Sequence, residues 1–253
     1  MPIIFRPSPI MLLGKEHPTY DKIDSTSLYG SFAAITVGSD PASPSIKYKG
    51  EDPNEDALVL YDDARYCVQA VADAHFGLAS SHSLITFLYE ALLSSIPKTQ
   101  EELAQLYEKF IFKEATHSET TLLIAIWDRK EKQGFGVSVG DSTLLLVHED
   151  GIEQCNPKNR RYIDPQKPFF KPEEFFYFSF PNNALLLAFT DGVDECNYRN
   201  PEKSINHEDF HKLFKQYGGY PKEYGSALIT LALKGVRGHK GGQDNIALIV
   251  SKT

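Results

Sequence analysis

The stretch NEDALVLYDDARYCVQAVADAHFG, residues 54–77, contains two apolar runs that are bordered by acidic side chains. The runs, 57–61 and 66–72, consist mainly of residues that strands favour. The pair Asp62-Asp63 between them suits a turn. We therefore expect two neighbouring strands here, with acidic residues before the first strand and after the second.

Acidic residues border apolar runs along the rest of the chain as well. The full set is Glu55, Asp56, Asp73, Asp141, Asp191 and Asp244. Alone, each has an ordinary explanation, since an Asp-Gly pair such as Asp191-Gly192 is usually only a turn. Together they border strands that would belong to one core, so their carboxylates could converge at one end of it. Converging carboxylates repel each other unless a hard cation lies between them. The set therefore predicts a site for two Mg²⁺ or Mn²⁺ ions.

Composition is ordinary for a globular protein, with 253 residues, 42% hydrophobic and 24% charged. A chain of this length can bury one large core, and we expect a single domain over residues 1–253. The net charge of −8 argues against nucleic acid or an anionic membrane as the main partner. It leaves a phosphorylated substrate open, because bound divalent cations would reverse the local charge.

Three widely spaced cysteines, Cys67, Cys155 and Cys196, form no Cys-x-x-Cys pair and indicate a reducing compartment. The start of the chain, residues 1–13, is too short for a membrane span and lacks a secretory cleavage pattern. We expect a cytoplasmic protein, and a monomer.

The order of apolar patterns predicts strands and helices in separate pairs. Residues 1–30 are expected to be irregular, and 38–53 and 152–174 to be loops. Strands are expected at 31–37, 57–61, 66–72, 120–127, 135–139, 143–147, 175–180, 184–189 and 246–250, with a hairpin turn at Asp150-Gly151. Helical periodicity is present in 78–93, after the capping box Thr99-x-x-Glu102, around 210–217 and in 224–236. The pattern indicates an α+β fold in which two packed antiparallel β-sheets are flanked by helix pairs. The aromatic run 169–180 is expected to pack in the core.

The acidic set with His75 points to phosphate chemistry. A water held between two metal ions is a strong nucleophile at neutral pH, and the metals offset charge on phosphoryl oxygens. His75, two residues after Asp73, could protonate the leaving alkoxide of a phosphoserine or phosphothreonine. Such a reaction needs no covalent nucleophile.

These residues resemble the metal-dependent serine/threonine protein phosphatases of the 2C type. The similarity runs from about Ser31 to the C-terminus in the family's order. The stretches that carry it are Asn54-Glu55-Asp56-Ala57, Val71-Ala72-Asp73-Ala74-His75-Phe76-Gly77, Glu119-Thr120-Thr121-Leu122, Val139-Gly140-Asp141-Ser142, Thr190-Asp191-Gly192-Val193 and Asp244-Asn245-Ile246.

The resemblance implies a role for each residue of the set. Asp73 would bridge two metals, and the main-chain carbonyl of Ala74 would bind one of them. Asp191 and Asp244 would complete the protein ligands of the other metal. Glu55 and Asp56 would hold metal-bound waters or bind directly, and Asp141 would help to form a third, weaker site. The implied fold is a β-sandwich flanked by helices on both sides, with residues 152–180 as a flap near the active site.

The chain departs from the family pattern at several positions. Glu51 stands where the family usually has an arginine that grips the substrate phosphate, and Lys49 or Lys47 is the nearest alternative cation. Ala74 and Phe76 replace glycines of the family motif, and Thr143 replaces an arginine.

Three functions fit these observations. The leading one is hydrolysis of phosphoserine or phosphothreonine in a phosphorylated protein. A second is a non-catalytic binding module on the same fold, motivated by Glu51. A third is hydrolysis of small phosphate esters, motivated by retained metal ligands without the arginine.

Overall fold

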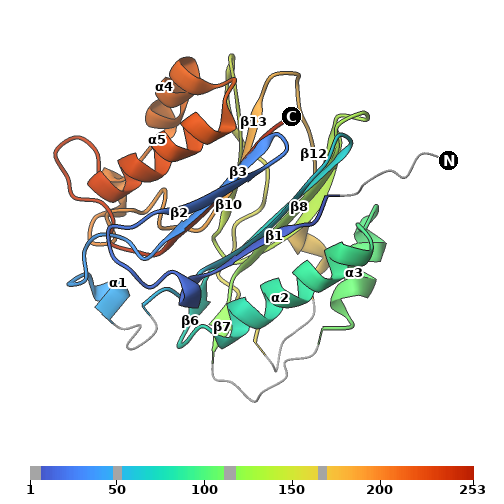
Figure 1. Ribbon diagram of the computed structural model, residues 1–253, viewed down its shortest axis with the longest axis horizontal. Coiled ribbons are helices and arrows are strands. Elements are labelled where there is room, and N and C mark those ends of the chain that lie inside the picture. Colours follow the sequence, from blue (N-terminus) through green and yellow to red (C-terminus); the bar gives the residue numbers. More distant parts are fainter. Residues whose placement is uncertain (1–6, 48–52, 111–117, 165–169) are drawn as a thin grey trace.

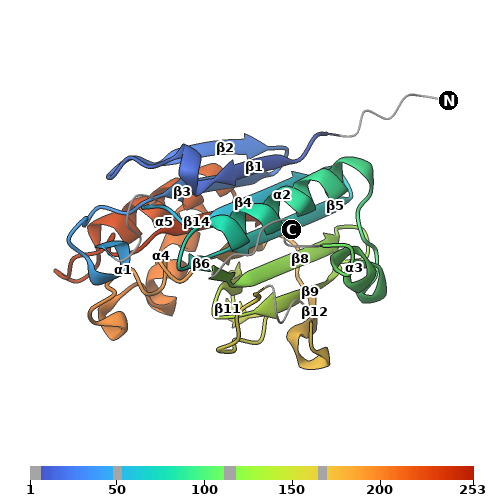
Figure 2. The same ribbon diagram turned by 90° about the horizontal axis from the view of Figure 1, so that it is seen from below.

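The computed structural model describes residues 7–47, 53–110, 118–164 and 170–253. In this part of the chain, two antiparallel sheets pack face to face, and a pair of helices covers the outer face of each (Figures 1 and 2). This is the α+β architecture predicted from the sequence.

The first sheet has the strand order β1-β4-β5-β8-β9-β12. Its strands are β1 (Ile10–Leu13), β4 (Ala57–Asp62), β5 (Tyr66–Ala72), β8 (Leu122–Asp128), β9 (Gln133–Val139) and β12 (Phe175–Ser179). The predicted pair is confirmed, since β4 and β5 run antiparallel with Ala57 opposite Ala72.

The second sheet has the strand order β11-β10-β13-β14-β3-β2. Its strands are β2 (Asp24–Leu28), β3 (Ser31–Thr36), β10 (Thr143–His148), β11 (Gly151–Gln154), β13 (Leu185–Phe189) and β14 (Ile246–Lys252). Strands β10 and β11 form the hairpin expected at Asp150-Gly151. A small separate ladder joins β6 (Ala74–His75) to β7 (Glu119–Thr120).

Four longer helices form the outer layers. Helices α2 (Ala79–Ser94) and α3 (Gln100–Tyr107) lie on the first sheet, and α4 (His207–Tyr217) and α5 (Pro221–Lys234) on the second. The Thr99 side chain caps α3 by accepting from the Glu102 N–H, as the capping box predicts. Shorter elements are α1 (Pro44–Lys47), within the predicted loop 38–53, and the 3₁₀ turns η1 (Gly14–Glu16), η2 (Pro172–Glu174) and η3 (Pro201–Lys203). Within the described ranges, no helix is both long and apolar enough to cross a membrane.

The N-terminal segment is a correction to the sequence analysis. Residues 1–30 were expected to be irregular, but β1 and β2 form one edge of each sheet. Strand β2 is polar, and β1 is a run of only four residues that follows Pro7 and Pro9. Edge strands tolerate both features, because one side of their backbone has no neighbouring strand. Neither strand therefore shows the apolar pattern of a central strand.

The flap expected over 152–180 is also shorter than predicted. Residues 152–154 belong to β11, and β12 occupies Phe175–Ser179 at the edge of the first sheet. The next strand, β13, lies in the other sheet, so the turn at 181–183 carries the chain across the sandwich. Phe169 lies outside the described residues, but the rest of the aromatic run packs mainly in the core, since Phe176, Phe178 and Phe180 are buried between the sheets and, of its aromatic residues, only Tyr177 is exposed.

Three hydrophobic clusters correspond to the three spaces between layers. One lies between the sheets around Trp127, a second between the first sheet and α2 around Leu84, and a third between the second sheet and α4–α5 around Phe210. Burial of each large apolar side chain contributes about 1.5–3 kcal/mol. The continuous inner cluster fixes how the ends of one sheet sit beside those of the other.

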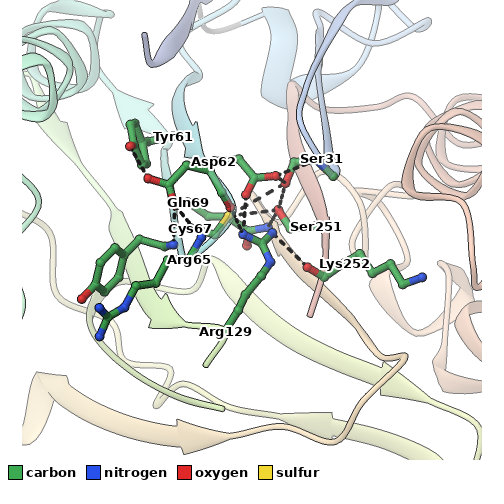
Figure 3. A network of polar contacts seen from close by, with 12 residues as sticks. Ser31, Tyr61, Asp62, Arg65, Cys67, Gln69, Arg129, Ser251 and Lys252 are labelled. Carbon is green, nitrogen blue, oxygen red and sulfur yellow. Dashed lines mark hydrogen bonds and ion pairs between the residues drawn. The ribbon is translucent and has the colours of Figure 1, made fainter. Parts of the chain in front are cut away.

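A polar network joins the two sheets at the end where β4 finishes and β5 begins (Figure 3). Asp62, fully buried, accepts from the Ser31 hydroxyl at 2.6 Å, and its other oxygen lies 2.6 Å from the Arg129 guanidinium. Gln69 donates to the Ser251 hydroxyl at 2.7 Å. Burial raises the pKa of Asp62, although Arg129 and the hydrogen bonds oppose the rise. The network therefore ties a buried carboxylate to a counter-charge.

Replacing Arg129 by methionine should lower the unfolding free energy by about 3 kcal/mol at pH 7.5, because Asp62 stays buried without its cation. Since the pKa of Asp62 is higher in the folded chain than in the unfolded one, its contribution is greatest below the unfolded pKa. It is lost as pH rises through the folded pKa. The loss of unfolding free energy caused by Arg129→Met should thus be smaller at pH 5 than at pH 7.5. Urea denaturation at both pH values measures this loss.

The matched control is Arg65→Met, which breaks the pair with Asp128 where the arginine is half exposed. It should have little effect at either pH. An equal loss in both variants, or a loss from Arg129→Met that does not change with pH, would contradict the assignment.

Candidate functional site

The acidic residues singled out in the sequence lie at the other end of the sandwich. Asp56 immediately precedes β4, and Asp73 immediately follows β5. The first residue of β4 pairs with the last residue of β5, so the two acidic residues lie at the same end of the strand pair. Asp141 lies between β9 and β10, Asp191 follows β13, and Asp244 precedes β14. In Figure 1 this end carries α1, β6 and β7. Strand ends from both sheets therefore deliver carboxylates to one region.

Asp191 is at the centre of this region. Burial raises its pKa well above the ordinary value, and the carboxylates of Asp244, Asp73 and Asp141 raise it further, in that order. These three residues come from the ends of strands in both sheets. Their role as ligands of shared metal ions stays a prediction. Asp191 Oδ1 is buried and has no hydrogen-bond partner among the described residues.

The main chain at Asp73 is held from both sides. Its N–H donates to Thr121 Oγ1 at 3.0 Å, and its carbonyl accepts from the Thr121 N–H at 2.8 Å and from Thr120 Oγ1 at 3.0 Å. Next to it, Ala74 and His75 form β6 against β7. This short ladder fixes the direction in which Asp73 and His75 leave the sheet.

Asp56 and Glu55 connect the two sheets at this end. Thr190 donates to Asp56 Oδ2 at 2.7 Å and accepts from the Ala247 N–H at 2.9 Å. Glu55 Oε1 accepts from the Gly77 N–H at 2.7 Å, and the Glu55 N–H donates to Asn245 Oδ1 at 3.0 Å. Both carboxylates therefore help to hold the neighbouring strand ends in place.

Asp244 is almost fully buried, and its carboxylate is held by α1 and by the residue that follows it. Its Oδ1 accepts from the Ser45 hydroxyl at 2.6 Å and from the Asn245 N–H at 2.8 Å. The Asn245 amide in turn donates to the carbonyls of Val37 and Pro53, at 3.0 and 2.7 Å. The closing Asp-Asn pair therefore unites the end of β3, the entry to β4 and the start of β14.

His75 is half-buried, and its ring packs edge-on against Tyr162, with the ring centroids 4.8 Å apart. Tyr162 was not predicted to belong to the site. Burial raises the pKa of its phenol to about 12, helped by Asp141, Asp73, Asp191 and Glu119. The phenol therefore stays protonated at neutral pH and is available as a hydrogen-bond donor beside the carboxylates.

The segment that carries Tyr162 is firmly attached, although the sequence analysis placed it in a surface loop. Asn159 accepts from the Gly140 N–H at 3.0 Å and donates from its own main chain to the Gly140 carbonyl at 2.8 Å. Ile163 pairs with Thr120. Nothing in the sequence marks these contacts, because single asparagines in a polar loop have no periodic pattern.

Two further charged residues at the site were missed. Burial raises the pKa of Glu195, and so do Asp194, Asp141 and Asp244, while Lys158 opposes the rise. Lys158 lies 3.2 Å from the Asp194 carboxylate. It brings one positive charge close to the acidic region. Lys49 and Glu51, on which the expected phosphate grip depended, lie outside the described residues.

The donor set fits hydrated divalent cations. No three acidic, histidine or cysteine side chains of the described ranges are close enough to form a ready-made metal cage. Yet the carboxylates that raise the pKa of Asp191 repel its ionised form, and a cation between them would offset this repulsion. Mg²⁺ commonly keeps several waters and takes only one or two carboxylates directly. A spread group of carboxylates with one buried, unsatisfied oxygen is compatible with such an ion.

Two open grooves that are lined by described residues lie away from the acidic region. One of about 650 Å³ is bordered by Tyr66, Ile126, Phe135 and Tyr177. These residues belong to the end of the first sheet opposite Asp73, so groove size does not mark the acidic region. The concentration of buried charge does.

Comparisons with known proteins agree with this architecture. The model of the family described as stage II sporulation protein E (SpoIIE) matches residues 77–253. A bacterial serine phosphatase structure shares 16% sequence identity, with a TM-score of 0.65 and coverage of 91% of this chain and 98% of that chain. No curated protein matches in sequence.

Two further structures have the same fold. The catalytic domain of the serine threonine protein phosphatase PstP, in complex with two manganese ions, gives a TM-score of 0.63 at 16% identity, covering 91% of this chain and 97% of that chain. The Ser-Thr phosphatase MsPP from Mycobacterium smegmatis, in complex with cacodylate, gives a TM-score of 0.63 at 17% identity, covering 90% and 99%.

In the presence of a chelator, the unfolding free energy of the protein should fall as pH rises toward 7.5. The folded-state pKa of Asp191 lies above its unfolded value, so its contribution is present at low pH and is lost as pH rises through the folded pKa. Mn²⁺ should reverse the loss, by about 2.7 kcal/mol at one hundred times its dissociation constant. Thermal unfolding with and without Mn²⁺ measures both effects.

Asp191→Asn removes one repelling charge, so it should unfold at a higher temperature in chelator and gain little from Mn²⁺. The control is Asp150→Asn, on a carboxylate that is exposed in the β10–β11 turn. It should respond to Mn²⁺ as the wild type does. A wild type that gains nothing from Mn²⁺ would refute the metal interpretation.

Proposed function

The chain belongs to the stage II sporulation protein E (SpoIIE) family, and from this premise we propose that it hydrolyses phosphoserine or phosphothreonine in proteins, with two Mn²⁺ or Mg²⁺ ions as cofactors. The resemblance to the 2C-type phosphatases inferred from the motifs is confirmed at the level of family and fold. The observation that carries the proposal is Asp191, a half-buried residue whose Oδ1 is buried without a hydrogen-bond partner among the described residues, and whose pKa is raised by burial and by the carboxylates of Asp244, Asp73 and Asp141.

In this proposal Asp73, Asp191 and Asp244 are the principal metal ligands. The Ala74 carbonyl contributes a further oxygen, and Asp141 serves an additional weaker ion. Bound cations would activate water and offset charge on the phosphoryl oxygens. The likeness of fold to manganese-bound PstP is compatible with this assignment, while the choice of a hard cation rests on the carboxylates of this chain.

Glu55 and Asp56 act as orienting groups. Each already accepts a hydrogen bond from another motif segment, Gly77 for Glu55 and Thr190 for Asp56. Each carboxylate keeps further lone pairs that can accept from ordered water. They would hold water molecules in position for the reaction and keep the strand ends at a fixed separation.

His75 is the proposed proton donor to the leaving alkoxide. Its main chain is fixed by pairing with β7, and its ring is fixed by the edge contact with Tyr162. A donor held in this way would need little rearrangement to reach an oxygen on a phosphoryl group that cations hold at Asp73 and Asp191.

Lys158 is the proposed source of positive charge for the substrate phosphate. Its ammonium group pairs with Asp194, beside Glu195 and the acidic region. Its loop is fixed by the Asn159–Gly140 hydrogen bonds, so the side chain starts from a defined position. It could exchange Asp194 for a phosphoryl oxygen at small cost, since both contacts are ionic.

Purified protein should hydrolyse a phosphoserine peptide with Mn²⁺ and lose this activity in chelator. Asp191→Asn should reduce kcat by about 100-fold or more, because it removes charge from the metal site. Release of inorganic phosphate measures the rate. The control, Asp150→Asn, removes an exposed carboxylate far from the region and should retain the wild-type rate.

Equal activity in chelator would refute the proposal. Mn²⁺ binding without turnover of any phosphorylated substrate would favour the binding module instead. Preference for small phosphate esters over phosphopeptides would favour the third function.

Lys158→Gln should raise KM for the phosphopeptide about tenfold and change kcat less, since a lost ionic contact with phosphate mainly weakens binding. Lys158→Arg should restore most of the affinity. Steady-state kinetics separates KM from kcat. Lys130→Gln, in the exposed turn after β8, is the control and should leave KM unchanged. An unchanged KM in Lys158→Gln would remove Lys158 from the phosphate site.

A further inference from the structure

Phe76 combines two unfavourable features. It is 80% exposed, and its φ of +62° lies in the left-handed region, which a bulky L-residue rarely adopts. It is not part of any of the three hydrophobic clusters. In the 2C-type motif this position is a glycine, which adopts such a φ without strain. Phe76 therefore costs conformational energy and gains no core contact in return.

The flanking backbone holds Phe76 in this conformation. The Gly77 N–H donates to Glu55 Oε1 at 2.7 Å, and the Gly77 carbonyl accepts from the Ser118 hydroxyl. On the other side, His75 pairs with Glu119 in the β6–β7 ladder. Phe76 cannot relax to an ordinary φ unless these contacts break. Strain that the surroundings impose in this way is frequent at ligand-binding positions.

Phe76 also lies beside the proposed proton donor. The centroid of its ring lies 6.4 Å from the centroid of the His75 ring. The His75 ring also contacts the Tyr162 ring, with a centroid distance of 4.8 Å. The exposed ring thus lies beside His75 and three residues after Asp73 in the chain. A peptide chain advances about 3.3–3.6 Å per residue. In the proposed function, the side chain next to a phosphorylated residue that cations hold at Asp73 would therefore fall within reach of Phe76.

We propose that Phe76 is a specificity-determining residue that contacts an apolar or aromatic side chain adjacent to the phosphorylated residue of a protein substrate. The inference rests on the proposed function, and it deepens it by naming a substrate class. Burial of an aromatic ring against an apolar partner releases water from both surfaces. A small phosphate ester without a flanking side chain gains nothing from this ring.

Phe76→Gly tests the inference. Two phosphoserine peptides are compared with Mn²⁺, one with leucine and one with glycine beside the phosphoserine. Wild-type protein should prefer the leucine peptide in kcat/KM, and Phe76→Gly should reduce this preference about tenfold. Its thermal midpoint should not fall, because glycine relieves the strain at φ +62°. A merely structural role would instead lower the midpoint and leave the preference intact.

Tyr29→Gly is the matched control. Tyr29 is 71% exposed with φ +51°, and it lies in the turn between β2 and β3 at the opposite end of the sandwich. The same exchange there should leave the peptide preference unchanged. If Phe76→Gly keeps the wild-type preference, or if Tyr29→Gly loses it equally, the inference is wrong and the proposed function stands.

Absence of any turnover by the wild type would count against the proposed function, and calorimetry would then decide the inference. Leucine-peptide binding with Mn²⁺ that weakens about tenfold in Phe76→Gly supports a recognition role on a binding module. Equal affinity in both proteins, or no binding by the wild type, overturns it.

Discussion

Mutual repulsion among carboxylates that the fold forces together is the constraint on which the acidic end of this protein depends. The carboxylates of Asp244, Asp73 and Asp141 raise the pKa of Asp191, and all four residues lie at or near strand ends. The strand ends cannot separate, because Thr190 joins Asp56 to β14 and Asn245 joins β3 to the entry of β4. The hydrogen-bonded frame thus opposes the repulsion, which a divalent cation would convert into attraction.

The features that could be predicted from the sequence are those with a local pattern. Central strands such as β5 are continuous apolar runs, and α2 buries Leu84, Ile85 and Leu88 at helical spacing. The position of each carboxylate at or near a strand end was also predictable, because each borders such a run. The edge strand β2 was not predictable, because a polar strand resembles a loop. Tyr162 was missed for another reason: its place beside His75 depends on Asn159 and Ile163, which anchor their loop through tertiary contacts alone.

Departures from the family motif have different consequences at neighbouring positions. Ala74 is fully buried within the β6–β7 ladder, so its added methyl group is accommodated by packing. Phe76, two residues later, is exposed and strained. A substitution that is buried and relaxed needs no functional explanation, because packing already accounts for it. A substitution that is exposed and strained is not explained by packing within the chain. For this reason Phe76 points to an external partner.

The two ends of the sandwich show why burial of an acid alone does not identify a site. Asp62 is fully buried and Asp191 has one buried carboxyl oxygen, and burial raises the pKa of both. At Asp62, however, Arg129 and the Ser31 hydroxyl oppose the rise, so the protein itself supplies the counter-charge. At Asp191 the surrounding charges are all acidic and act in the same direction as burial. The protein supplies a counter-charge at Asp62 but none among the groups that raise the pKa of Asp191, where a bound cation would offset the negative charge.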